Sequence, residues 1–288
     1  MNSDVRGNRS GAPGQVKEIT SLANPVIKDI RSLALKKFRD EQNAFIAEGL
    51  KLVIDALDLG WTIRTLVFAK SALGHPLVEK VAARSVAAGA LVLEVSEKVL
   101  TAVTRKDNPQ IVLGVFEQKT TALRDVRIGS GDVWVALDRI RDPGNLGTVI
   151  RTVDAVGAKG VMLVGDCVDP FALETVRATM GSVFAVPLVK TSSDAFVQWR
   201  KGFNGMLAGT HLKGAVDYRS VSYAGKPLVL LMGNESQGLP EPLAALCDTL
   251  VRIPQAGRAD SLNLAVATGV MLYEARRDAL SLTVDGTP

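Results

Sequence analysis

Two loops rich in glycine and small polar side chains hold the residues whose types and spacing could do chemistry. They are residues 233–238 and 253–263, and they follow two short apolar runs at 228–232 and 250–253. Apolar runs that stop at Gly or Pro are typical of buried strands. Because ligands of open α/β sheets bind at the loops beyond the carboxyl ends of the strands, the two loops predict one shared site.

A third segment, residues 133–151, repeats this arrangement. A predicted strand at 133–138 runs into a Gly/Pro loop, and a helix is expected to begin near Asn145. Asn145 and Arg151 lie six positions apart, so an ideal helix does not stack them on one face. Both side chains reach the surroundings of the helix N-terminus if Arg151 bends back.

Several common chemistries are disfavoured by the sequence. Gly129-Ser-Gly131 precedes its strand, and no Gly-x-Gly-x-x-Gly fingerprint follows one, which weakens a dinucleotide-binding interpretation. The chain has neither a Gly-Lys-Ser/Thr loop nor a Gly-x-Ser-x-Gly elbow. Its two histidines, His75 and His211, are too few for a typical His-ligated metal centre, and no metal is expected.

Together, the three segments resemble the three motifs of the SpoU/TrmH-type RNA ribose 2′-O-methyltransferases of the SPOUT superfamily. The matching positions are Asn145-x-Gly147-x-x-x-Arg151, Gly233-x-Glu235-x-x-Gly238 and Ile253-Pro254-x-x-Gly257-x-x-x-Ser261-Leu262-Asn263. Any one motif is weakly specific, whereas three in this order and at these separations are strongly specific. The resemblance covers about residues 130–280, and residues 18–116 at lower specificity.

The resemblance implies methyl transfer from S-adenosylmethionine to a ribose hydroxyl. This cofactor carries its own activated methyl group. The protein has to hold sulfonium, methyl and hydroxyl oxygen in line and help to remove one proton, which needs neither a metal nor a covalent nucleophile. The residues expected at the reacting groups are Arg151, Asn145, Glu235, Ser261 and Asn263.

Each of these residues has an expected role. Arg151 acts as a base or orients the target ribose and phosphate; orientation is favoured because arginine stays protonated and its planar fork suits phosphate. Asn145 and Asn263 fix loop and substrate geometry, although Asn145 could equally cap its own helix. Ser261 bonds near the target hydroxyl or caps the last helix. Glu235 binds Arg151, takes part in proton transfer, or has a structural role such as capping the helix that follows it.

By the same resemblance, the cofactor lies across the second and third loops, where backbone groups bond its adenine and ribose. Gly233 is expected to permit close approach, and Gly238 and Gly257 to permit loop turns, although a turn alone also explains a single glycine. The expected cofactor-binding residues are Thr210, Gly233, Asn234, Ile253, Gly257 and Leu262.

The net charge of +4 lies in the first part of the chain. Residues 1–120 carry 17 Lys and Arg against 13 Asp and Glu, and residues 121–288 carry 17 of each. A helix starting at Asn24-Pro25 and continuing to Leu35 has basic residues on its polar side, which suits phosphate contact but also an ordinary surface helix. The expected RNA-binding residues on this stretch are Lys28, Arg31, Lys36 and Lys37. The resemblance adds Arg105 and Lys106, in a segment that could also be a solvated turn, and Arg177, which could also be a dimer contact.

The predicted organisation has four parts. They are a disordered basic arm at 1–17, a small α/β RNA-binding domain at 18–117, a linker at 118–131 and a catalytic domain at 132–288. Strands alternate with helices in both domains, and in the second they predict a mostly parallel sheet with helices on both faces. The resemblance adds a deep trefoil knot and a homodimer formed through the C-terminal domain.

The second domain is predicted element by element. Its expected strands are 133–138, 160–164, 184–189, 205–209, 228–232 and 250–253. Its expected helices are 146–156, 171–179, 193–201, 240–246 and 262–280.

The composition sets the remaining expectations. The chain is 47% hydrophobic, yet it has no apolar run of the roughly eighteen residues that a membrane span needs, and its polar N-terminus is unlike a secretory signal. Cys167 and Cys247 are too few for a disulfide framework and are expected to be core residues. A cytoplasmic protein without a membrane partner is therefore expected.

The predicted function is S-adenosylmethionine-dependent 2′-O-methylation of RNA, with ribosomal RNA favoured over tRNA because the first domain resembles those of rRNA-acting members. The alternatives are a tRNA 2′-O-methyltransferase and a non-catalytic RNA-binding factor that keeps the fold. A nucleotide-binding oxidoreductase is the weakest alternative, because the fingerprint is missing.

Overall fold

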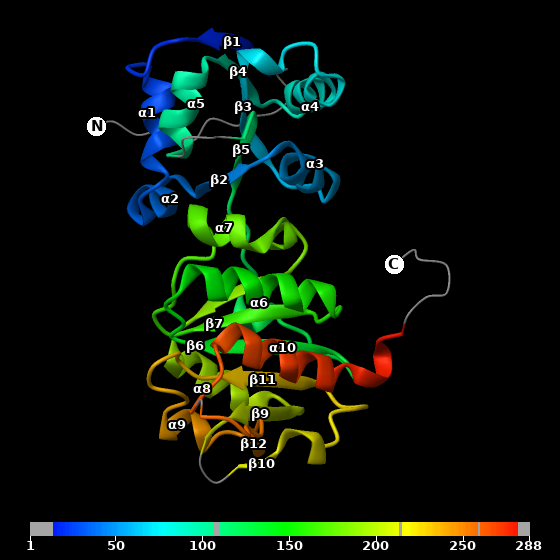
Figure 1. The fold of residues 1–288 in the computed structure, drawn as a ribbon. Helices are drawn as coiled ribbons and strands as arrows, with labels where there is room; N and C mark the ends of the chain where they lie inside the picture. The colour runs from blue at the N-terminus through cyan, green and yellow to red at the C-terminus, as the bar shows by residue number, and fades with distance from the viewer. Residues whose placement is uncertain (1–13, 106–109, 213–214, 259, 282–288) are drawn as a thin grey trace, which may run out of the picture. The chain divides into compact units, whose positions relative to one another are not determined.

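The computed structural model describes residues 14–105, 110–212, 215–258 and 260–281 (Figure 1). The chain divides into two compact units, one up to Gln118 and the other from Lys119. Each unit contains its own sheet.

The first unit is a five-stranded mixed sheet covered by helices. Its strands are β1 (Val16–Ile19), β2 (Ala44–Glu48), β3 (Ile63–Ala69), β4 (Leu91–Val95) and β5 (Val112–Glu117), in the order β1-β4-β3-β5-β2. Its helices are α1 (Pro25–Ser32), α2 (Lys36–Gln42), α3 (Leu50–Asp58), α4 (Pro76–Ala87) and α5 (Glu97–Thr104). Helices α1 and α5 pack together on one side of the sheet, and α3 and α4 on the other (Figure 1).

The predicted N-terminal helix is interrupted. Asn24 caps α1 as expected, since its Oδ1 accepts a hydrogen bond from Val26 N at 2.9 Å. The prediction that one helix continues to Leu35 is wrong, because α1 ends at Ser32. Arg39 of α2 is buried and donates through Nη1 to the carbonyls of Leu33 and Ala34. It satisfies carbonyls at the end of α1 rather than facing solvent.

The first strand also begins within the predicted arm of residues 1–17. Strand β1 starts at Val16, which pairs with Val92 of β4 in a parallel register. Gly14 N already donates to Val86 O at 2.9 Å. The prediction of disorder is therefore wrong for Val16 and Lys17, and the rest of the predicted arm up to residue 13 lies outside the described residues.

The second unit is built on a seven-stranded parallel sheet. Its strands are β6 (Val133–Asp138), β7 (Gly160–Val164), β8 (Leu188–Thr191), β9 (Met206–Thr210), β10 (Val216–Asp217), β11 (Leu228–Met232) and β12 (Thr249–Arg252). Their order is β10-β12-β9-β11-β6-β7-β8, and every pairing is parallel. Its helices are α6 (Pro143–Ala155), α7 (Leu173–Thr179), α8 (Ser193–Gly202), α9 (Glu241–Ala244) and α10 (Leu264–Ala275).

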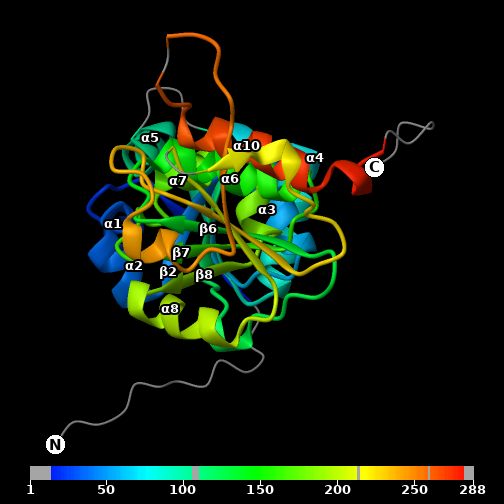
Figure 2. The ribbon, with the colours of Figure 1, turned by 90° about the horizontal axis from the view of Figure 1, so that it is seen from below.

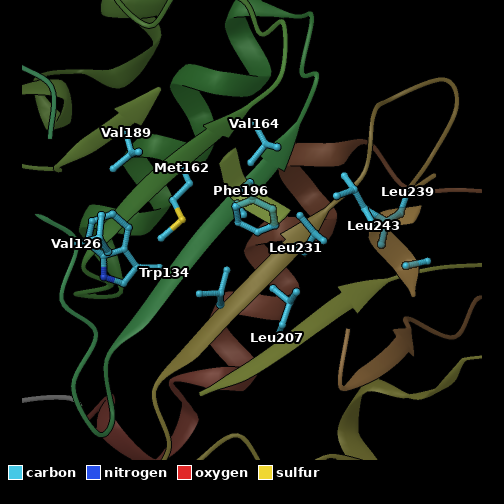
Figure 3. Packing of buried hydrophobic residues seen from close by; sticks show 13 residues of the cluster. Val126, Trp134, Met162, Val164, Val189, Phe196, Leu207, Leu231, Leu239 and Leu243 are labelled. Carbon is cyan, nitrogen blue, oxygen red and sulfur yellow. The ribbon is translucent and has the colours of Figure 1, made fainter. Parts of the chain in front are cut away.

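Helices cover both faces of this sheet, which confirms the predicted class. Helices α6, α7 and α10 lie on one face and α8 on the other (Figure 2). Alternate residues of β6, Trp134 and Ala136, turn toward α8, whose Phe196 is fully buried in that core (Figure 3). Alternation between the two faces is what a doubly covered parallel sheet requires of its strands. The trefoil knot stays a prediction.

The predicted linker is largely part of the second unit. Thr121 N donates to Leu188 O of β8 at 2.8 Å, and Val126 is buried in the core beneath α8. Leu123 and Ile128 pack against the same core. The segment is polar in sequence, but three spaced apolar side chains are enough to bind it to the sheet.

Element boundaries in the second unit also differ from prediction. The last helix is shorter than predicted: α10 runs from Leu264 to Ala275, and a 3-10 turn at Arg277–Ala279 follows it. β8 begins at Leu188, four residues later than predicted, because Ser182–Phe184 forms a 3-10 turn. The two-residue β10 was not predicted. No helix in the described part of the chain has the length and apolar content of a bilayer-spanning helix.

Candidate active site

The carboxyl ends of three neighbouring strands, β9, β11 and β12, open into one cavity of about 480 Å³. Parallel strands bring their carboxyl ends to the same edge of the sheet, which is why segments distant in sequence meet there. Five of the six residues predicted to bind the cofactor line this cavity: Thr210, Gly233, Asn234, Ile253 and Leu262. Glu235 and Ser261 line it as well.

Glycine is required at Gly233 and Gly238 of the second loop, but not at Gly257 of the third loop. A Cβ on Gly233 would lie 2.2 Å from Leu239 N, so the backbone itself excludes a side chain. Gly238 has a left-handed φ of +68°. The φ of Gly257 is not positive, and a Cβ at this position would have no neighbour within 4 Å. Gly257 also does not line the cavity. The predicted turn requirement at Gly257 is therefore wrong.

Asn234 folds the second loop back on itself. Its backbone pairs with Gly238 in both directions, at 3.1 and 2.8 Å. Its Oδ1 accepts hydrogen bonds from Ser236 N and Gln237 N, at 2.9 and 3.1 Å. Its Nδ2 donates to the carbonyl of Arg139 at 2.8 Å, which ties the loop to the end of β6.

Glu235 joins the second loop to the N-terminus of α6. Its carboxylate accepts from the backbone nitrogens of Arg141 and Asp142, at 3.3 and 3.2 Å, and from Asn145 Nδ2 at 3.4 Å. A carboxylate is favoured there because the free backbone N–H groups at a helix N-terminus carry partial positive charge. The idea that Glu235 caps the following helix is wrong, since α9 has no side-chain cap.

Two asparagines link the first and third loops. Asn263 Nδ2 donates to Asn145 Oδ1 at 2.9 Å. Asn263 is also the N-cap of α10, with Oδ1 accepting from Ala265 N at 2.9 Å, so Ser261 does not cap that helix. Asn145 does not cap α6 either: Asp142 does, and its Oδ1 accepts from Asn145 N at 2.6 Å. Glu235, Asn145 and Asn263 thus form one chain of hydrogen bonds through all three motifs.

Arg151 stands apart from this network. It lies on α6 with an exposed side chain, beyond the first two turns of the helix. Among the residues that the structure describes, its guanidinium has no hydrogen bond or ion pair, so the predicted contact with Glu235 is not formed. An exposed guanidinium without an internal partner is available to a ligand.

The predicted RNA-binding residues fall on both units. Lys28, Arg31, Lys36 and Lys37 are exposed on α1 and α2, and Arg105 is exposed at the end of α5. Lys36 and Lys37 form ion pairs with carboxylates four residues further along α2. Arg177 is half-buried in α7 of the second unit, and Lys106 lies outside the described residues.

Several site residues were not predicted. His211 and Leu212 line the cavity directly after β9, and Gln237 and Ala267 line it from the second loop and α10. The position of His211 one residue past a parallel strand is the signal that could have indicated it.

Both cysteines are free thiols, as expected of core residues. Burial raises the pKa of Cys167 to about 11 and that of Cys247 to about 12. Neither thiol is therefore a ready nucleophile near neutral pH. No group of three or more potential ligand side chains that could hold a metal occurs within the described ranges.

Comparison with known proteins agrees with this geometry. Residues 132–273 match the SpoU rRNA Methylase family, and residues 24–114 match the MRM3-like substrate binding domain. Because relatives above 30% identity match over nearly their whole length, the chain belongs to the SpoU family of rRNA methylases.

Three similar proteins illustrate the relationship. The 23S rRNA (uridine(2479)-2′-O)-methyltransferase of Streptomyces viridochromogenes is 33% identical over 87% of this chain and 88% of its own. The 23S rRNA (guanosine(2553)-2′-O)-methyltransferase RlmP of Bacillus subtilis is 31% identical over 91% of this chain and 100% of its own. A crystal structure of an AdoMet-bound rRNA methyltransferase from Sinorhizobium meliloti is 61% identical, with a TM-score of 0.89, and covers 93% of this chain and 100% of that one.

Proposed function

We propose that this protein transfers the methyl group of S-adenosylmethionine to a ribose 2′-hydroxyl of ribosomal RNA. The observation that carries the proposal is the chain of hydrogen bonds from Glu235 through Asn145 to Asn263, which joins all three motifs beside one cavity. Two relatives with this activity on 23S rRNA match the chain over nearly its full length.

The cavity suits the cofactor in size and chemistry. Its volume of about 480 Å³ falls within the range of roughly 300–1,000 Å³ that small-molecule sites occupy. Leu239, Leu262 and Leu264 give it apolar walls for an adenine ring, and the loop backbones around Gly233 and Ile253 offer polar groups. When bound, the cofactor supplies an activated methyl group, so the protein's part is to bind and orient.

Arg151 is the group proposed to orient the target nucleotide. Its exposed guanidinium carries a permanent charge, and its planar fork can hold a phosphate through two hydrogen bonds. Ser261, which lines the cavity, is proposed to form a hydrogen bond near the ribose hydroxyl. Asn145, Glu235 and Asn263 then act by fixing the loops rather than by touching the RNA.

The first unit is proposed to dock the RNA. It matches a substrate binding domain, and the excess of positive charge lies in this part of the chain. Its α1 presents Lys28 and Arg31, and Arg105 lies at the end of the neighbouring α5. With ribosomal RNA as its substrate, the enzyme is expected to be cytoplasmic. The second candidate substrate is tRNA.

A homodimer through the second unit is part of the proposal. Val266 and Tyr273 of α10 are 53% and 56% exposed, and with Val270 they form one apolar face at spacings of four and three residues. An exposed apolar face of this kind is typical of a surface that another subunit covers. Sedimentation equilibrium should show a dimer, and Val266→Glu/Tyr273→Glu should shift it to monomer; a monomeric wild type contradicts this part.

The proposed activity is tested by methyl incorporation. Labelled S-adenosylmethionine and the purified full chain are incubated with total RNA from a strain lacking the protein, and 2′-O-methyl sites are mapped. The expected result is one new site in ribosomal RNA. A single site in tRNA would correct the substrate but retain the chemistry.

Calorimetry separates the remaining outcomes. Cofactor binding without incorporation into free RNA calls for the same assay on ribosomal subunits. If neither assay gives incorporation and calorimetry detects no cofactor binding, the protein is a non-catalytic RNA-binding factor that keeps the fold.

A further inference from the structure

Arg139, which follows β6, connects the end of that strand to the loop of the second motif. Its backbone is left-handed, with φ 48°, a conformation that residues other than glycine seldom adopt. Its N–H donates to Val164 O at 2.9 Å, and its carbonyl accepts from Asn234 Nδ2 at 2.8 Å. The strained backbone is therefore held from both sides, by strand β7 and by the loop.

The side chain of Arg139 makes a second connection to the same loop. Its Nε and Nη2 donate to Asp138 Oδ2, at 3.0 and 2.9 Å, and the Asp138 side chain is only 1% exposed. Its Nη1 donates to Gln237 Oε1 at 3.0 Å. Because the guanidinium is planar and rigid, the buried carboxylate that fixes Nε and Nη2 also fixes the direction in which Nη1 points.

Arg139 itself does not line the cavity, but both of its loop partners do. Asn234 and Gln237 are among the lining residues, and Asn234 organises the loop through Ser236 N, Gln237 N and Gly238. Arg139 thus attaches the loop to the end of β6 at two points, in addition to the bonds of Glu235 to Arg141 N and Asp142 N just beyond that strand. Neither contact is predicted by the three sequence motifs, which do not include this residue.

We propose that Arg139 is a positioning residue for cofactor binding. It holds residues 234–238 in the conformation that forms one wall of the cavity. The inference rests on the proposed function, because the ligand in question is S-adenosylmethionine. In this proposal the buried Asp138 anchors the guanidinium of Arg139, and Gln237 accepts its remaining hydrogen bond.

A lysine at position 139 separates this role from a general effect on folding. Lysine keeps the positive charge beside Asp138, so the buried carboxylate stays compensated. Its single nitrogen lacks the fork that bonds Asp138 and Gln237 in fixed directions. Arg139→Lys should therefore keep the fold while loosening the loop.

The test is calorimetric titration of the full-length protein with S-adenosylhomocysteine, with melting temperatures measured in parallel. Arg139→Lys should bind about tenfold more weakly, which corresponds to about 1.4 kcal/mol. Methylation kinetics should show a raised KM for the cofactor and a nearly unchanged kcat, a split that a merely structural role would not produce. Arg219→Lys is the matched control: its Nε and Nη2 donate to Asp217 outside the cavity, and its affinity should equal that of the wild type.

A double-mutant cycle identifies the partner. Gln237→Ala should weaken binding, and Arg139→Lys/Gln237→Ala should be no weaker than the worse single variant, because both changes break one connection. Additive losses, or wild-type affinity in Arg139→Lys, would overturn the inference while leaving the proposed function standing. If the wild type binds no cofactor, both the inference and the proposed function are wrong. If Arg139→Lys lowers the melting temperature, the test is whether the losses in affinity of Arg139→Lys and Gln237→Ala are additive.

Discussion

Of the five residues expected at the reacting groups, three hold the loops, whereas Arg151 and Ser261 are exposed and have no hydrogen bond within the described residues. Glu235, Asn145 and Asn263 direct their hydrogen bonds to one another and to helix termini. Arg151 has no such partner among the described residues and is exposed. Residues with all their bonds inside the protein position a site, whereas an unpartnered exposed cation can meet a substrate.

This division predicts a clean separation of effects in Arg151→Ala. Methyl transfer should fall by about 100-fold or more, since loss of correct orientation alone can cost that much. Affinity for S-adenosylhomocysteine and the melting temperature should stay at wild-type values, because the side chain supports neither the cavity nor the fold. Single-turnover methylation, calorimetry and thermal unfolding measure the three quantities.

Arg151→Lys serves as the comparison, since it keeps the charge but not the planar fork. If two hydrogen bonds to phosphate matter, lysine should restore only a small part of the rate. A wild-type rate in Arg151→Ala would show that another group orients the nucleotide.

At the residue scale, the sequence predicted which side chains belong to the site better than it predicted their partners. Glu235 bonds Arg141 N across 94 positions of chain, and spacing along the sequence says nothing about such a pair. The true caps are Asp142, three positions before the expected Asn145, and Asn263, two positions after the expected Ser261. Any Asx or Ser residue near a helix start satisfies the same capping rule, so the rule alone does not choose among neighbours.

At the scale of elements, the close approach of α6 and α7 explains a glycine of the first motif. A Cβ on Gly147 would lie 2.4 Å from Ala178 Cβ and 2.8 Å from Thr175 O. The helices therefore touch backbone to backbone at this position. Because α6 carries both Asn145 and Arg151, its distance from α7 also sets where these residues stand relative to the loops.

Two helical glycines make a matched pair for testing this packing. Gly147→Ala should destabilise the protein, because overpacking costs roughly 1–3 kcal/mol and outweighs a gain of up to about 1 kcal/mol in helix propensity. Gly269→Ala on α10 should stabilise it by roughly 0.5–1 kcal/mol, since a Cβ there meets only Thr152 Cγ2, at 3.9 Å. Urea unfolding of the full chain measures both.

The opposite signs distinguish packing from propensity. Stabilisation by both alanines would mean that α6 and α7 separate easily, and Gly147 would then need another explanation. Destabilisation by both would point to a constraint on α10 as well, such as a subunit that covers it.

Strand identity in the second unit was predictable, and the ends of elements were less so. The apolar runs of β6, β7, β9 and β11 are buried on both faces, which gives an unmistakable signal in a parallel sheet. β10 has two residues, and the packing of the 118–131 segment depends on three isolated apolar side chains. Such features follow from the tertiary environment rather than from local periodicity.

At the scale of the whole molecule, charge and chemistry are divided between the two units. The net positive charge lies within residues 1–120, whereas the cavity and the three motifs lie entirely in the second unit. If the first unit docks RNA, its contribution should be electrostatic, sensitive to salt, and separable from cofactor binding.

Charge reversal on the two faces of the first unit tests this division. Lys28→Glu/Arg31→Glu alters α1, and Lys51→Glu/Lys80→Glu makes the same change in net charge on α3 and α4, across the sheet (Figure 1). All four side chains are exposed, and the ion pair that Lys51→Glu breaks with Asp55 lies at the surface, so neither pair of changes should cost more than about 1 kcal/mol of stability. With the RNA fragment that carries the methylated site, the α1 variant should bind at least about tenfold more weakly. Its slope of log affinity against log salt should shrink by about 0.7–0.9 for each phosphate that the variant no longer neutralises.

Cofactor affinity should stay unchanged, because the cavity is built from the other unit alone. Equal losses in both variants would mean that only net charge matters, and no loss in either would remove the first unit from RNA docking.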